Sequence, residues 1–156
     1  MEKTNVMRLL EQKKIGYCAH TYGNGEALSG DEVARELGQE PARVYKTLVA
    51  QGASKRYYVF MVPVYGELDL KKAAKASGEK SIAMIKSKEL LPLTGYVHGG
   101  CSPIGMKKQF PTFIHTVAHE DQTIFFSAGK IGYQVEIMTA DLEKMIRIQK
   151  TDLLPD

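Results

Sequence analysis

The sequence predicts a single α+β domain, and three observations support that prediction. Candidate strands and helices follow one another without the strict alternation of a doubly wound fold, which favours a curved, mixed central sheet flanked by short helices. The 156 residues are enough for one hydrophobic core, and contents of 44% hydrophobic and 25% charged residues are ordinary for a globular protein. No repeat, linker or low-complexity segment divides the chain, so residues 1–156 are expected to form one domain.

Charge and hydropathy narrow the class of protein. No apolar run approaches the roughly 18 residues of a membrane span, and residues 1–14 lack the apolar core of a secretory signal. The cytoplasm is therefore the expected location, with no membrane partner. The net charge of +3 does not by itself indicate a nucleic-acid binder. Lysines do cluster at 71–75 and 107–108, which fits either a solvated face or contacts with a phosphate backbone.

Helix signals occur at five places. Thr4 is a candidate cap, Ser29 with Glu32 forms a capping-box pattern, and Gly38 and Gly78 are candidate stops. The predicted helices cover residues 4–16, 29–37, 69–77, 87–91 and 140–146, with one helical turn at 41–44. Pro92 is expected to end the fourth helix, Thr139 to cap the last, and the tail 151–156 to fray.

Strand signals are clearest at residues 57–62, where six β-favouring residues precede Pro63. The small residues 52–54 predict a hairpin with the extended run before them. In all, strands are predicted at 17–22, 45–51, 57–62, 112–117, 123–127 and 133–137. The glycine- and proline-rich residues 99–105 predict a loop.

Lys46 interrupts an apolar run and is the first candidate for a functional residue. Strand alternation places it on the same face as Val44 and Leu48. If that face is buried, the ammonium must point into a cavity, where it can bind a carboxylate, a carbonyl or a phosphate. The alternative is that Lys46 lies on a solvated face.

The loop 99–105 is the second candidate, because glycine allows backbone N–H groups to approach a substrate oxyanion closely. The small-residue turn at 127–130 is placed to close the same pocket. Both stretches are equally compatible with ordinary structural turns, and neither matches a phosphate-binding or dinucleotide fingerprint.

Cysteine and histidine give two competing hypotheses. The spacing of His98, Cys101, His115 and His119 is similar to that of a zinc site, although its first pair is His/Cys rather than Cys/Cys. Alternatively, Cys101 is a nucleophile with His98 or His20 as its base, but no third residue is placed to orient that base.

Short motifs along the chain resemble one family when they are taken together and in order. They are His20-Thr21-Tyr22, Gly30-Asp31-Glu32-Val33, Val44-Tyr45-Lys46-Thr47-Leu48, Leu68-Asp69-Leu70-Lys71-Lys72, Gly95-Tyr96, Gly99-Gly100, Ser102-Pro103 with Gly105, and Ser127 with Gly129-Lys130. Over residues 4–145 this set resembles the YbaK/EbsC family, the free-standing relatives of the editing domain inserted in bacterial prolyl-tRNA synthetases.

The resemblance implies a curved mixed sheet with a pocket at its mouth, and hydrolysis of the ester that joins an amino acid to the tRNA 3′ end. Its best-known members clear cysteine from tRNA(Pro). Cysteine and proline are close in size, so a synthetase pocket cannot easily exclude one by shape, and a second site must edit. The resemblance implies tRNA(Pro), through its acceptor end, and prolyl-tRNA synthetase as partners.

The resemblance also implies roles for particular residues. Lys46 is the main functional residue and holds the substrate carbonyl or the terminal ribose and phosphate. The other implied contacts are pocket walls at Tyr22 and Thr47, ester contacts at Gly99, Gly100 and Ser102, and an opposite wall at Ser127 and Gly129. The substrate thiol attacks its own ester, and such oriented attack can be worth about 7–11 kcal/mol without a metal, a cofactor or a protein nucleophile.

Two departures from the family pattern leave the substrate open. Leu28-Ser29 stands where members often place an aromatic residue, and Gln134 where many have an aspartate. An alanyl-tRNA(Pro) or other misacylated-tRNA deacylase therefore remains an alternative, as does a non-catalytic tRNA-binding or regulatory module. A zinc-binding interaction protein is the third hypothesis.

Overall fold

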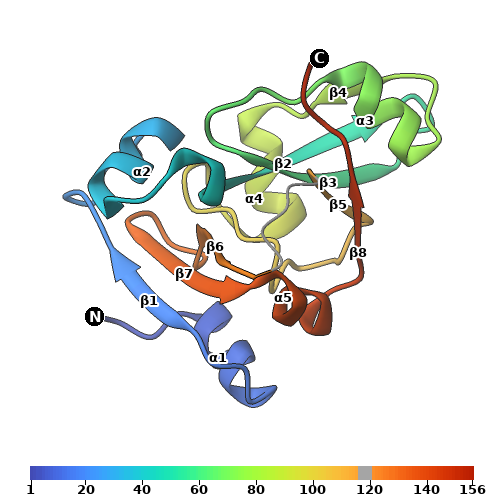
Figure 1. Cartoon of the computed structure of the whole chain (residues 1–156). Helices are drawn as coiled ribbons and strands as arrows, with labels where there is room; N and C mark the ends of the chain where they lie inside the picture. Colours follow the sequence, from blue (N-terminus) through green and yellow to red (C-terminus); the bar gives the residue numbers. More distant parts are fainter. Residues whose placement is uncertain (116–120) are drawn as a thin grey trace.

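The computed structural model describes residues 1–115 and 121–156 and confirms the α+β prediction (Figure 1). Short helices flank strands from both halves of the chain. The elements are α1 (Asn5–Gln12), β1 (Cys18–Thr21), α2 (Gly30–Leu37), the 3₁₀ turn η1 (Pro41–Arg43), β2 (Tyr45–Gly52), β3 (Tyr57–Pro63), α3 (Leu70–Ser77), β4 (Ile82–Met84), α4 (Ser87–Thr94), β5 (Thr112–His115), β6 (Thr123–Ser127), β7 (Tyr133–Met138), α5 (Thr139–Met145) and β8 (Ile148–Thr151). Within the described residues, no helix has the length and apolarity that a membrane span requires.

The strands form two sheets that meet at one point. The antiparallel sheet has the order β1-β7-β6, and the mixed sheet has the order β4-β2-β3-β5-β8, in which β5 runs parallel to both β3 and β8. A parallel bridge between Val44 and Phe125 joins the two sheets. The expected central sheet is therefore in two parts.

Beyond Val44 the two sheets separate, and this separation exposes one edge of β2. The pairing of β2 with β4 begins at Ala50, so among the described strands none pairs with that edge from Tyr45 to Leu48. Backbone N–H and C=O groups on an unpaired edge remain available to a ligand. The cavity described below lies along this edge.

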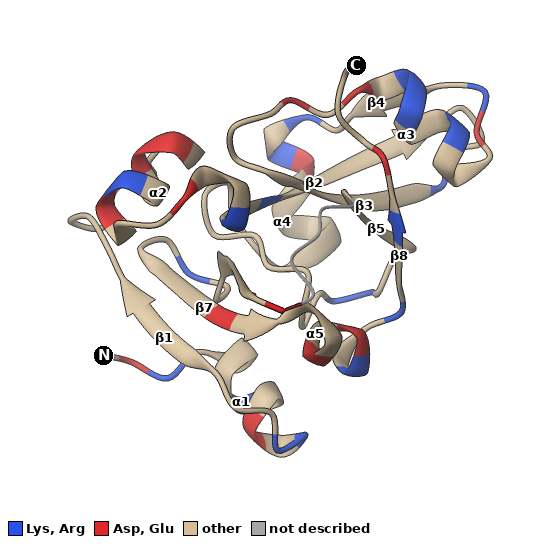
Figure 2. Cartoon of the chain, viewed as in Figure 1, with Lys and Arg blue, Asp and Glu red and all other residues tan. Residues whose placement is uncertain are grey.

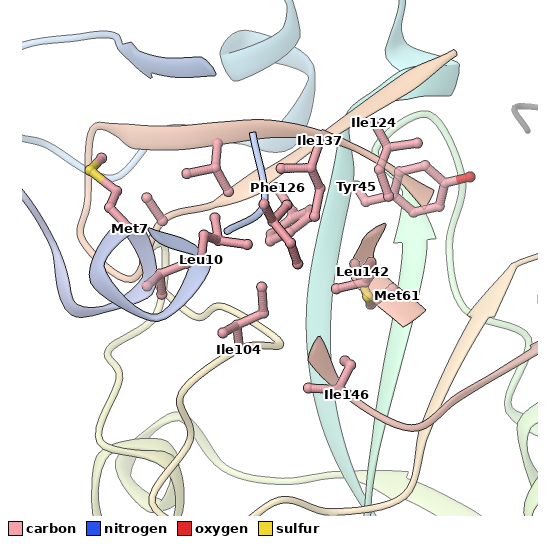
Figure 3. Close-up of a cluster of buried hydrophobic side chains, with 14 of the residues drawn as sticks. Met7, Leu10, Tyr45, Met61, Ile104, Ile124, Phe126, Ile137, Leu142 and Ile146 are labelled. Carbon is pink, nitrogen blue, oxygen red and sulfur yellow. The ribbon is translucent and has the colours of Figure 1, made fainter. Parts of the chain in front are cut away.

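The largest core cluster fills the space between α1, the antiparallel sheet and α5 (Figure 3). Thr4 caps α1 by accepting a hydrogen bond from the Met7 N–H, as the sequence predicts. Leu10 then packs with Phe126 of β6 and Ile137 of β7, and all three side chains are at most 1% exposed. Burial of one such side chain is worth about 1.5–3 kcal/mol, so α1 anchors the back of this sheet.

Helix α2 packs over the junction of the two sheets. Its predicted capping box is present, since Ser29 accepts from the Glu32 N–H and the Glu32 carboxylate accepts from the Ser29 N–H. Gly38 ends the helix in the left-handed conformation. Val33 then packs beside Val44 and Phe125, which places the start of α2 next to the exposed edge of β2.

Two predictions about helix ends are wrong. Helix α4 continues past Pro92 to Thr94, because the Thr94 hydroxyl donates to the Leu90 carbonyl and the Gly95 N–H donates to that of Leu91. Helix α5 begins at Thr139 itself, with Met138 as a cap residue that makes no side-chain bond.

The prediction of a frayed tail is also wrong. Strand β8 pairs in parallel with β5, and Leu153 and Leu154 after it are buried in the second core cluster. The Leu153 N–H donates to Nδ1 of His115 at 3.0 Å, and Lys72 donates to the Leu154 carbonyl at 2.6 Å. These bonds order a segment that has no strong local signal of its own.

Glu136 links β7 to the loop before β2 and supports a prediction about stability. Burial alone would raise the pKa of its carboxyl, but hydrogen bonds from Thr123 and His20 and the charge of Arg43 lower that pKa below its ordinary value of 4.5. A lowered folded-state pKa adds stability that is present above about pH 4.5 and is lost as the pH falls through the folded-state pKa.

We expect Glu136→Gln to lower the free energy of unfolding at pH 7 by about 1–3 kcal/mol, because the charge-assisted bonds are lost. The difference from wild type should be smaller at pH 3 than at pH 7, because a growing fraction of Glu136 is protonated as the pH falls below 4.5 towards the folded-state pKa. Urea denaturation at the two pH values measures this. A difference of the same size at pH 3 would contradict the electrostatic explanation.

Candidate functional site

A cavity of about 190 Å³ lies where the two sheets separate. Its walls are the edge of β2, the start of α2, residues 98–101 and the facing ends of β6 and β7. Segments far apart in the sequence therefore meet here, because the sheet divides just beyond the bridge between Val44 and Phe125.

Of the eight residues to which the resemblance gives a role, five line this cavity: Tyr22, Lys46, Thr47, Gly99 and Ser127. Strand alternation would place Lys46 and Thr47 on opposite faces of β2. Both reach the cavity because it lies along the edge of the strand rather than over one face.

Gly100, Ser102 and Gly129 are not among the cavity-lining residues. A side chain at Gly100 would meet backbone atoms of Lys130 and Ile131 at 3.0–3.4 Å, so glycine allows the two loops to touch. Gly129 has a φ of +92°, which favours glycine, and Ser102 is fully buried with its Oγ accepting from the Ile104 N–H at 3.3 Å. These three residues lie in the loops that support the cavity wall.

The Lys46 side chain is 27% exposed and carries the cationic group of the cavity wall. Its Nζ lies 3.3 Å from Oε1 of Glu67, whose own side chain is 89% exposed. An ion pair with so exposed a partner is worth about 0–1 kcal/mol. Glu67 therefore does little to keep the ammonium from an anionic or carbonyl oxygen in the cavity.

Two buried polar atoms in the wall have no hydrogen-bond partner among the described residues, namely Oγ1 of Thr47 and Oε1 of Gln134. Leaving a buried polar group unsatisfied costs about 1–3 kcal/mol, so each atom is expected to bond to an ordered water or to a polar ligand. Ser127 Oγ accepts from the Gly129 N–H at 3.1 Å, which leaves its O–H free to donate. The cavity thus combines a cation with donors and acceptors.

Sequence reasoning noted Gln134 only as a departure from a family pattern and did not place it in the site. The register explains its position, because Gln134 pairs directly with Ser127 across β7 and β6, and paired residues share a face. Once Ser127 was a candidate, that pairing was the signal to look for. Leu28 and His98 also line the cavity.

The three described residues of the zinc hypothesis do not form a metal-ligand cluster. His98 and Cys101 line the cavity, His115 on β5 bonds to the Leu153 N–H, and His119 lies outside the described residues. Among the residues that the structure describes, no three His, Cys, Asp or Glu side chains form a metal-ligand cluster. His20 is bonded through Nε2 to Glu136 at 2.9 Å.

Burial raises the pKa of the Cys101 thiol to about 12, so at neutral pH it is protonated and a poor nucleophile. We expect Cys101→Ala to keep any activity of the site within about threefold of wild type, because a protonated thiol is a poor nucleophile. Iodoacetamide should label the exposed Cys18 first and Cys101 much more slowly. The expectation is contradicted if Cys101→Ala loses activity and if the wild-type protein loses activity as its Cys101 is labelled.

Comparison with known proteins decides the family. A model of the aminoacyl-tRNA editing domain matches residues 25–145, which is most of the chain and includes most of the cavity wall. The chain belongs to the aminoacyl-tRNA editing domain family. The resemblance to YbaK/EbsC proteins is thereby confirmed.

A sequence relative supports the same family, and two solved structures share the fold. The chain is 48% identical over 137 residues to EbsC of Enterococcus faecalis, provisionally named a Cys-tRNA(Pro)/Cys-tRNA(Cys) deacylase, covering 87% of this chain and 84% of that protein. It is similar in fold to a crystal structure provisionally described as a trans-editing enzyme for prolyl tRNA synthetase, with a TM-score of 0.81 and 24% identity over 97% of this chain and 95% of that one. A hypothetical protein of known structure has a TM-score of 0.86 at 17% identity, covering 99% of this chain and 100% of its own.

Proposed function

We propose that this editing domain, residues 1–156, hydrolyses misacylated tRNA in trans and that its main substrate is Cys-tRNA(Pro). The observation that carries the proposal is the cavity, which combines the Lys46 ammonium with the unpartnered polar atoms of Thr47 and Gln134. The 48% identity to EbsC supports cysteine as the amino acid that is cleared. We propose the cytoplasm as the location of this activity, because a tRNA substrate is available there.

The cavity-lining residues have distinct proposed roles. Lys46 binds the ester carbonyl or the terminal ribose and phosphate, and stabilises negative charge that develops on the carbonyl oxygen. Tyr22 and Thr47 form the wall beside it, and Gly99 and Ser127 contact the ester from the opposite side. Gly100, Ser102 and Gly129 act through the loops that hold this wall in place.

The proposed chemistry is assisted by the substrate and uses neither a metal nor a cofactor. The cysteine sulfur attacks the ester carbonyl, a C–S bond forms, and the C–O bond to the ribose breaks. The thiol proton passes to the departing ribose oxygen, and water then opens the cyclic thioester to give free cysteine. Holding thiol and carbonyl in attack geometry can supply about 7–11 kcal/mol, which suits a site whose own thiol is protonated.

One observation favours a second substrate. Leu28 and Gln134, the two departures from the family pattern, both line the cavity. A changed wall at these two positions can alter the choice of amino acid, so alanyl-tRNA(Pro) is the alternative substrate. In either case we propose that prolyl-tRNA synthetase supplies the misacylated tRNA(Pro).

The test is deacylation of cysteinyl-, alanyl- and prolyl-tRNA(Pro) by the purified protein, with and without prolyl-tRNA synthetase. Rapid loss of cysteine with prolyl-tRNA(Pro) intact supports the proposal, and preferential loss of alanine supports the alternative. No hydrolysis of any of the three esters would overturn both and leave a binding role.

A further inference from the structure

Two segments that help to line the cavity carry opposite charge. Residues 80–108, which provide α4 and the cavity-lining His98, contain five lysines against the single acidic residue Glu89. Residues 26–40, which provide α2 and the cavity-lining Leu28, contain five acidic residues against the single basic residue Arg35. Figure 2 shows that α2 carries mainly acidic residues, whereas lysines stand at the start of α4. The whole chain has a net charge of only +3, so this division is local and large.

Four of these lysines lie along α4. Lys86 and Lys88 stand at its first turn, and the stem of Lys107 lies against Gly95 just past its last residue. The Lys107 N–H donates to the Thr94 carbonyl at 3.0 Å, which fixes the chain of Lys107 and Lys108 beside the end of the helix. Two lysines thus stand at each end of α4, and a backbone hydrogen bond fixes the pair at its end.

These four side chains are exposed, and none has a carboxylate within ion-pair distance among the described residues. Many lysines elsewhere are paired with acids, for example Lys3, Lys72, Lys130 and Lys144. Lys86 and Lys88 also lie at the positive end of the helix dipole, where a cation is unfavourable. Their position therefore does not stabilise the helix, and it concentrates positive potential at one place.

Exposed apolar side chains accompany the lysines. Among the described residues six large hydrophobic side chains are exposed, and three of them are Met84, Leu91 and Val97, at 44–51%. Exposed apolar groups beside unpaired cations fit a partner that offers both phosphates and the apolar faces of ribose and bases. An acidic peptide would satisfy the lysines but gives no reason for the apolar groups.

We propose that the α4 surface, defined as Lys86, Lys88, Lys107, Lys108, Leu91 and Val97, docks the phosphate backbone of the RNA acceptor strand whose 3′ end enters the cavity. This inference rests on the proposed function and adds the direction from which the RNA strand approaches the cavity. The strand runs over α4 and past His98 into the cavity, while the negative charge of α2 repels it from the other side. The RNA is therefore bound in one orientation.

The test compares two variants with the same change in charge. The docking variant carries alanine at Lys86, Lys88, Lys107 and Lys108. The control variant carries alanine at Lys13, Lys14, Lys71 and Lys75, which are exposed, lie on other elements and do not line the cavity. Each protein is titrated with uncharged tRNA(Pro) at several salt concentrations, and thermal melting checks that both variants fold.

We expect the docking variant to bind tRNA at least about tenfold more weakly, with a slope of log K against log salt that is smaller by about 3, since each lost phosphate contact removes about 0.7–0.9. The control should keep most of the wild-type slope. Equal losses in both variants, or no loss in the docking variant, would overturn the proposal.

A second substrate separates this inference from the proposed function. Cysteinyl-adenosine carries the ester but no phosphate backbone, so the docking variant should hydrolyse it at the wild-type rate while KM for cysteinyl-tRNA(Pro) rises. If neither ester is hydrolysed but tRNA binding still depends on α4, the proposed function fails and the docking surface stands. If both esters are hydrolysed and binding is unchanged, the docking surface alone fails.

Discussion

Replacing Lys46 with alanine is expected to lower kcat/KM for deacylation of Cys-tRNA(Pro) by about 10²–10³-fold, the usual loss when one donor to a developing oxyanion is removed. The residue carries the cationic group of the cavity wall, and its partner Glu67 is too exposed to hold it strongly. Because the charge acts on the transition state, the loss should fall mainly on kcat. Single-turnover deacylation at saturating enzyme measures it directly.

Two control variants separate this effect from a general loss of charge. Glu67→Gln removes the ion-pair partner and should keep the wild-type rate, because that carboxylate takes no part in the reaction. Lys144→Ala removes a paired, exposed lysine on α5 and should also leave the rate unchanged. If Lys46→Ala deacylates as fast as these controls, the proposed role of Lys46 is wrong.

Features that depend on neighbouring residues in the chain could be predicted from the sequence. Thr4 and Ser29 with Glu32 cap helices, and Gly38 and Gly78 end them, as the sequence indicates. A cap forms within one turn, so the residues that decide it lie within about four positions of one another. The family resemblance added the fold, which local signals alone did not define.

Features that depend on distant partners could not be predicted in this way. Strand β4 is three residues long, and it is defined by pairing with β2 rather than by its own pattern. The tail is ordered by His115 and Lys72, which precede it by 38 and 82 residues. The division of the sheet at Val44 is likewise a tertiary feature.

The candidate site likewise has features that the sequence could predict and features that it could not. Period-two alternation indicated that Lys46 faces a cavity if Val44 is buried, and Val44 is 1% exposed. Alternation also placed Thr47 on the opposite face, and only the exposed edge of β2 explains why both residues line one cavity. The unpartnered oxygen of Gln134 is visible only when the partners of every polar atom are known.

Replacing Gln134 with leucine is expected to slow deacylation by about tenfold or more and yet to leave the protein as stable or about 1 kcal/mol more stable. The Gln134 side chain is 5% exposed, and its Oε1 has no partner among the described residues, so no protein group offsets the cost of its desolvation. Leucine has a similar volume and no polar atom, which removes that cost. Opposite changes in rate and stability are typical of a residue that serves a ligand.

The substrate group that Gln134 contacts can be identified from the same variant. An amide oxygen accepts a hydrogen bond, and the α-amino group of the esterified amino acid is the donor we expect it to meet. With the wild-type protein, N-acetyl-cysteinyl-tRNA(Pro) should therefore react more slowly than cysteinyl-tRNA(Pro). With Gln134→Leu the two substrates should react at the same slow rate, because the effects of removing the two partners of one contact are not additive.

Gln51→Leu is the matched control. Gln51 lies outside the cavity and donates a hydrogen bond to the Lys55 carbonyl, so this variant should lose stability and keep activity. A fall in stability of Gln134→Leu with unchanged activity would instead make Gln134 part of the framework of β7, and the choice of amino acid would then depend on the wall at Leu28.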